Sequence, residues 1–212
     1  MTFTEILSNG LISAGGGISY YIGIIATLAA GYFLGSVNFA VIFGMNKTKA
    51  QSVLAFACDF IKGALAAFIG MLFMPADGFA CVSTLACAAG HFFPIFFGFH
   101  GYGGAAMFLG AALVINPLAA LISGIAFLIV LCFSKYMAAS TVAMTLTFPI
   151  VNFYLPFSLF SGAGDAMDTA YLVNYLCLTL VPILIAGCYV LAHVQNIRRI
   201  IDGTEKKITD NQ

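Results

Sequence analysis

The chain has 212 residues, of which 62% are hydrophobic and only 8% are charged. This composition excludes an ordinary soluble domain and indicates an all-α membrane protein that crosses the bilayer several times as a helical bundle. Eight basic residues balance eight acidic ones, so no overall charge favours nucleic acid as a partner.

Apolar segments long enough to cross a bilayer follow one another along the chain. About 30 Å of hydrocarbon needs roughly 17 to 25 helical residues. The candidates are 20–44, 52–74, 78–98, 105–133, 136–157 and 170–192. The fourth is too long for one straight crossing, and Asn116-Pro117 near its middle predicts a break. It forms either one long tilted helix or two short ones.

The charged residues favour two short helices. Positive residues prefer the cytoplasmic side, and seven spans with an external N-terminus place every basic segment there. These segments contain Lys47, Lys49, Lys135, Arg198, Arg199, Lys206 and Lys207. The acidic loops, with Asp77, Asp165 and Asp168, then lie outside. We therefore predict about seven transmembrane helices within residues 1–195 and a basic cytoplasmic tail over 196–212.

The first two spans contain glycines and polar groups in apolar surroundings. Gly31 and Gly35 form a G-x-x-x-G step, which indicates close helix packing more than function. Ser36 and Asn38 follow and need partners from a neighbouring helix or a substrate. In the second span Asp59 and Lys62 share one helical face. A self-contained ion pair and a site for an anionic substrate are equally open interpretations of this pair.

The segment from Gly90 to Gly104 is the least suited to a plain hydrophobic helix. It contains two histidines, Pro94 and a run of glycines before an apolar segment begins at Ala105. Such glycines allow a turn that points free N–H groups at an anion near a helix N-terminus. The alternative, which the glycines alone favour, is a tight turn whose glycines only permit close packing.

The last span ends at His193, which opens the pattern His193-x-x-Asn196-x-x-Arg199. This spacing places the three side chains on one side of a helix. An imidazole, an amide and a guanidinium suit a polar head group that carries hydroxyls and phosphate. The alternative is a basic juxtamembrane helix that contacts anionic lipid.

Together, five segments resemble those of the bacterial integral-membrane glycerol-3-phosphate acyltransferases that use acyl phosphate as the donor. They are Gly35-Ser36-Val37, Asp59-Phe-Ile-Lys62-Gly63, Gly90-His91-Phe-Phe-Pro94-Ile-Phe, Lys135-Tyr136 with Ser140-Thr141, and the tail from His193 to Glu205. Their order and separation hold over about residues 30 to 208.

The resemblance implies a multi-pass enzyme of the bacterial inner membrane with its active site on the cytoplasmic face. Its reaction would move a fatty acyl group from acyl phosphate to the 1-hydroxyl of sn-glycerol 3-phosphate, giving lysophosphatidic acid for phospholipid synthesis. No metal or cofactor is implied. The catalytic candidates are Ser36, His193 and Asn196. The substrate-binding candidates are Lys62, Gly90, His91, His100, Gly101, Gly103, Gly104, Arg199 and Glu205.

Two features of the family are absent from this sequence. Its loop G-S-G-N-x-G-A-T-N is replaced by the short stretch from Gly44 to Lys49, and its turn F-K-G-G-K-G-V-A-T lacks both lysines, with His100 in place of the first. Each lost charge-assisted contact removes roughly 1.5 to 3 kcal/mol of binding. Two alternatives follow: a non-catalytic member that binds lipid or a protein, and an acyltransferase for a less anionic alcohol.

Overall fold

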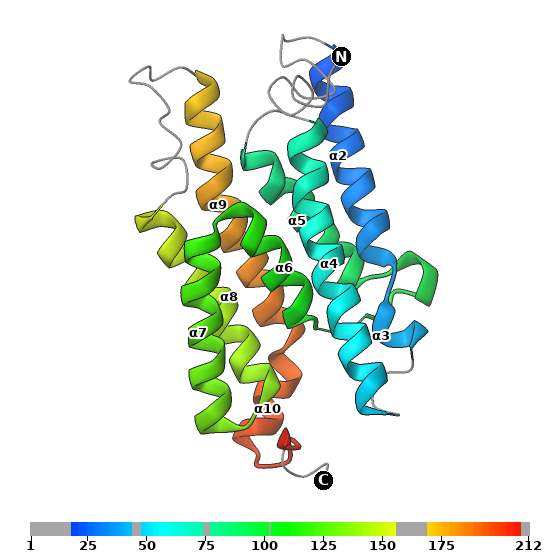
Figure 1. Ribbon diagram of the computed structural model, residues 1–212, viewed down its shortest axis with the longest axis vertical. Helices are drawn as coiled ribbons and strands as arrows, with labels where there is room; N and C mark the ends of the chain where they lie inside the picture. Colours follow the sequence, from blue (N-terminus) through cyan, green and yellow to red (C-terminus); the bar gives the residue numbers. More distant parts are fainter. Residues whose placement is uncertain (1–17, 44–47, 74–76, 102, 156–168, 209–212) are drawn as a thin grey trace.

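A computed structural model describes residues 18–43, 48–73, 77–101, 103–155 and 169–208 (Figure 1). Their helices are α2 (Ile18–Ser36), α3 (Phe39–Ile42), α4 (Lys49–Phe73), α5 (Asp77–Phe92), the short 3₁₀ helix η1 (Ile95–Phe97), α6 (Ala105–Ile115), α7 (Pro117–Ser134), α8 (Met137–Tyr154), α9 (Thr169–Ala192) and α10 (Val194–Ile201). The predicted all-α bundle is confirmed. Lys47, Asp165, Asp168 and most of the shortened loop lie outside the described residues.

Six helical stretches within these ranges are long and apolar enough to cross a membrane. They are Tyr21–Ile42, Lys49–Phe73, Gly78–Phe97, Pro117–Ser134, Met137–Tyr154 and Tyr175–Ala192. The helix α6 has 11 residues and reaches only about 16 Å. A seventh crossing, the orientation of the termini and the division at residue 195 therefore stay predictions, and α10 runs across that division.

The expected break at Asn116-Pro117 is confirmed. Asn116 has extended backbone angles, as a residue before proline prefers. Its side-chain oxygen accepts a hydrogen bond of 3.1 Å from the backbone N–H of Ala119, which caps α7. The Asn116 amide also donates to Asn152 of α8 at 2.9 Å and to the Leu155 carbonyl at 2.6 Å. The break is thus held by a buried network, and α6 and α7 run in opposite directions (Figure 1).

Two predicted spans are shorter as α-helices than the sequence suggested. The predicted span 20–44 is divided between α2 and α3 at residues 37–38, and the predicted span 78–98 leaves its α-helix at Phe92. Pro94 lacks the backbone N–H that a further helical turn would use, and Gly98, with φ of 62°, then reverses the chain after η1. Both breaks lie where the candidate residues gather.

Glycines bring the helices close enough for backbone to meet backbone. A Cβ atom on Gly35 of α2 would collide with the Cys87 carbonyl of α5, and one on Gly90 of α5 would collide with the Tyr32 carbonyl of α2. Gly63 of α4 lies equally close to the Met107 carbonyl of α6. The packing interpretation of the G-x-x-x-G step is therefore confirmed.

The basic segments lie at one end of the bundle (Figure 1). The start of α4 with Lys49, the α7–α8 turn with Lys135, and α10 with Arg198 share that end. The N–H of Ile208 donates to the Lys135 carbonyl at 3.1 Å and so fastens the tail to the turn. This placement supports the predicted topology.

Replacing Asn116 with alanine is expected to lower the free energy of unfolding in detergent micelles by about 2 kcal/mol. α7 loses its cap, and Asn152 loses a partner. Ser123→Ala is the matched control, because it removes one side-chain bond within α7, to the Ala119 carbonyl. Thermal unfolding measures both variants, and equal stabilities would contradict the role given to Asn116.

Candidate active site

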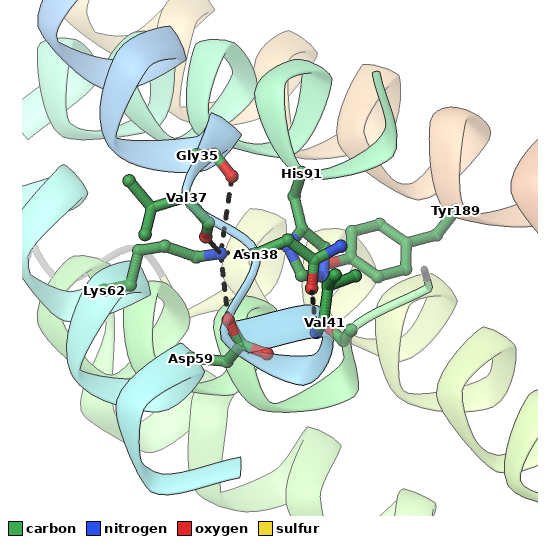
Figure 2. A network of polar contacts seen from close by, with 9 residues as sticks. Gly35, Val37, Asn38, Val41, Asp59, Lys62, His91 and Tyr189 are labelled. Carbon is green, nitrogen blue, oxygen red and sulfur yellow. Dashed lines mark hydrogen bonds and ion pairs between the residues drawn. The ribbon is translucent and has the colours of Figure 1, made fainter. Parts of the chain in front are cut away.

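A buried ammonium group joins three helices near the end of α2. Lys62 of α4 is 1% exposed. Its Nζ lies 2.9 Å from Asp59 Oδ1, 2.8 Å from the Val37 carbonyl oxygen and 3.0 Å from His91 Nδ1. Figure 2 shows it reaching toward the break between α2 and α3. The two intramembrane charges thus pair with each other, as one of the two interpretations expected.

This ammonium accounts for the unexpected break in the first span. The last carbonyls of a helix have no partner within the helix and carry partial negative charge. Lys62 donates to the Val37 carbonyl and lies 3.4 Å from that of Gly35. A cation from α4 therefore satisfies the end of α2 and lets the chain leave the helix inside apolar surroundings.

Polar side chains surround this break. Ser36, fully buried, donates through Oγ to the Tyr32 carbonyl at 2.9 Å. Asn38, also fully buried, caps α3 by accepting the Val41 N–H at 3.4 Å. Gly90 lies against the backbone of Ser36. The structure therefore brings the candidates Ser36, Lys62, Gly90 and His91 together.

The turn that precedes α6 contains Gly101, Gly103 and Gly104 and is called the glycine turn here. It lies between two histidine rings. Its Gly101 N–H donates to the Phe92 carbonyl at 3.1 Å. A Cβ atom on Gly103 would collide with the His193 ring, and one on Gly104 would collide with His91 Nε2. α6 begins directly after Gly104. The expected turn before a helix N-terminus is confirmed, and only glycine leaves room for both imidazoles.

His193 lies at the junction of α9 and α10 and is 7% exposed. Its Nδ1 is 2.8 Å from the Tyr189 carbonyl. A carbonyl only accepts hydrogen bonds, so Nδ1 carries the proton and neutral His193 keeps a lone pair on Nε2. That Nε2 is among the ring atoms next to Gly103. The geometry therefore places a proton acceptor against the glycine turn.

The tail candidates form a second cluster one helical turn further along. Asn196 Nδ2 donates to Glu205 Oε1 at 2.9 Å, and Arg199 Nε donates to Glu205 Oε2 at 2.7 Å. One carboxylate thus holds both side chains. His100 belongs to neither cluster: its ring is exposed, and Nδ1 donates to the Gly98 carbonyl at 2.7 Å.

Sequence reasoning missed Tyr189. Its side chain is fully buried, its hydroxyl donates to the Gly104 carbonyl at 2.9 Å, and its ring meets Phe92 edge to face at 4.8 Å. It thereby holds the glycine turn next to His193. A tyrosine four residues before His193 in an apolar helix was the available signal, because that spacing puts both on one face.

Comparison with known proteins identifies relatives over most of the chain. The family model described as glycerol-3-phosphate acyltransferase matches residues 45–203. A glycerol-3-phosphate acyltransferase of Alkaliphilus metalliredigens (strain QYMF) is 33% identical over 175 residues, which cover 82% of this chain and 77% of the relative. One of Aquifex aeolicus (strain VF5) is 30% identical over 160 residues, covering 75% and 74%.

Solved structures give the same fold. The crystal structure of PlsY (YgiH), an integral membrane glycerol 3-phosphate acyltransferase, in its glycerol 3-phosphate form matches with a TM-score of 0.73 and 23% identity. The match covers 87% of this chain and 95% of that one. Its lysophosphatidic acid form matches with a TM-score of 0.72. The long match to the family model and the two relatives at 30% identity or above settle the family: the chain belongs to the glycerol-3-phosphate acyltransferases.

Proposed function

We propose that this chain transfers a fatty acyl group from acyl phosphate to the 1-hydroxyl of glycerol 3-phosphate, at the inner leaflet of the bacterial inner membrane. Lysophosphatidic acid and phosphate are the products. The observation that carries the proposal is the buried His193 imidazole, whose Nε2 lone pair lies against the glycine turn. Membership of the family supplies the reaction class.

In this reaction the hydroxyl oxygen attacks the acyl carbon, and the bond from that carbon to the phosphate oxygen breaks. His193 Nε2 takes the hydroxyl proton during the attack and returns it to the departing phosphate. Phosphate is already a good leaving group, so the protein mainly positions the reactants and stabilises negative charge. A buried imidazole beside the glycine turn suits that task.

Substrate phosphate is recognised by two groups of donors in this proposal. The backbone N–H groups at the start of α6 follow the glycine turn directly and carry the positive end of the helix dipole. Asn196 and Arg199 provide side-chain donors one turn beyond His193. Ser36 is not one of these donors, because its buried hydroxyl at the end of α2 donates to the Tyr32 carbonyl.

A less anionic alcohol is the second candidate acceptor. The turn lacks the two lysines of the family, and Lys62 is occupied by Asp59, His91 and backbone carbonyls. Product formation with a panel of polyols, with and without phosphate, decides between the acceptors. If no alcohol is acylated, the chain is a lipid- or protein-binding member of the family.

Replacing His193 with alanine is expected to lower kcat for lysophosphatidic acid formation by about 10²- to 10⁴-fold, because the hydroxyl loses its proton acceptor. The assay uses the purified chain in lipid, acyl phosphate and radiolabelled glycerol 3-phosphate. Gln195→Ala is the control on the same helix, since the Gln195 side chain is exposed. A rate for His193→Ala close to that of the control would refute the proposed base.

Glu205 gives the tail a dependence on pH. Burial alone would raise the pKa of its carboxyl, but the hydrogen bonds from Asn196 and Arg199 and the positive charge of Arg199 lower the pKa below its ordinary value. Because the pKa is lower in the folded tail than in the unfolded one, the ionised carboxylate stabilises the folded tail at pH values above about 4.3, the ordinary pKa of a glutamate. That stabilisation is lost as the pH falls through the folded-state pKa.

Hydrogen exchange measures this loss. The N–H groups of Thr204 and Glu205 donate to the Arg199 carbonyl, so their protection factors report on the closed tail. We expect protection to fall on acidification below about pH 4.3, and Glu205→Gln to remove most of that dependence on pH. An unchanged pH profile in Glu205→Gln would show that another group controls the tail.

A further inference from the structure

Lys62 determines which ring nitrogen of His91 carries the proton. An ammonium group donates hydrogen bonds and accepts none. Four acceptors surround its nitrogen, which are Asp59 Oδ1, the Val37 and Gly35 carbonyls and His91 Nδ1. His91 Nδ1 must therefore offer its lone pair, and the single proton of the neutral ring lies on Nε2.

The Nε2–H of His91 has no hydrogen-bond partner among the described residues. The Asn38 amide nitrogen, in the segment that Lys62 binds, has none there either. The two side chains are 1% and 0% exposed. Buried polar groups are almost always paired. Two buried donors without an acceptor therefore indicate an acceptor that a ligand brings.

His91 Nε2 faces the glycine turn. It lies against Gly104, and the preceding residue, Gly103, lies against the His193 ring. Figure 2 draws Asn38, from the break between α2 and α3, together with His91, from α5. A ligand oxygen at the turn would therefore meet neutral N–H donors. The charged Lys62 donates to the other nitrogen of the His91 ring and so keeps the His91 donor in place.

The geometry points to a subsite in which His91 Nε2–H, with the Asn38 amide, binds a phosphoryl oxygen of the substrate while Lys62 fixes the donating tautomer. Lys62 is thus a positioning residue and does not itself bind the substrate, because its protons are taken within the protein. This inference rests on the proposed function. It supplies neutral donors to a turn that lacks the lysines of its family.

Nitrogen NMR of the full chain, labelled with ¹⁵N-histidine and held in lipid, tests the tautomer. The chain has three histidines, so loss of a signal in His91→Gln assigns His91. We expect a proton on Nε2 and none on Nδ1. In the double variant Asp59→Asn/Lys62→Met, which removes both charges together, we expect a mixture of tautomers. A proton on Nδ1 in the unmodified chain would overturn the inference.

Two variants of His91 test the roles of its two ring nitrogens separately. Glutamine places an N–H donor near the position of Nε2, whereas asparagine places an acceptor near Nδ1 and leaves no donor at Nε2. We expect His91→Asn to raise KM for glycerol 3-phosphate about tenfold, the effect of one hydrogen bond, and His91→Gln to raise it less. The reverse order would overturn the assignment.

The Asn38 donor has a variant of its own. Serine also caps helices, so Asn38→Ser preserves the start of α3 while it removes the amide donor. Weaker binding of glycerol 3-phosphate with unchanged thermal stability supports the subsite. Equal binding by the variant and the unmodified chain counts against a role for Asn38.

Direct titration separates this inference from the proposed reaction. Glycerol 3-phosphate should shift the His91 Nε2 signal, and glycerol at the same concentration should not. If that shift occurs in a chain that makes no lysophosphatidic acid, the reaction fails and the subsite stands. If the chain is active and neither compound shifts the signal, the subsite fails and the reaction stands.

Discussion

The ammonium of Lys62 is the contact on which the rest of the site depends. It joins the end of α2, the Asp59 carboxylate of α4 and the His91 ring of α5 in buried surroundings. Removing one partner of such a buried pair costs about 3–5 kcal/mol, because the other charge is left uncompensated. Lys62 thus keeps the break after Ser36 in place and orients the imidazole behind the glycine turn.

The site is assembled from helix ends, where the backbone leaves its regular hydrogen bonding. α2 and α5 both end here, α6 begins here, and His193 lies where α9 passes into α10. Inside a membrane such irregular backbone is tolerated only where protein groups satisfy it. Lys62 and Tyr189 provide that satisfaction by donating to the Val37 and Gly104 carbonyls. Polar chemistry can therefore take place below the surface of an apolar bundle.

The sequence was informative where the signal is local. Asn116-Pro117 predicted a helix break, and the spacing of His193, Asn196 and Arg199 predicted side chains on one helical face; of these, Asn196 and Arg199 meet at Glu205. The division of the first span was not predictable, because it depends on Lys62, about 25 residues away in the chain. Tyr189 has a local signal in its spacing from His193, but its contact with the glycine turn was not predictable, since Gly104 is 85 residues away.

The glycine contacts between helices bear on how far related sequences can diverge. Where two backbones touch, as at Gly35 and Gly63, only the absence of a side chain matters. The lipid-facing positions ask only for apolar character. A few fixed positions can therefore preserve the architecture while most of the surface drifts, which accounts for a common fold at 23% identity.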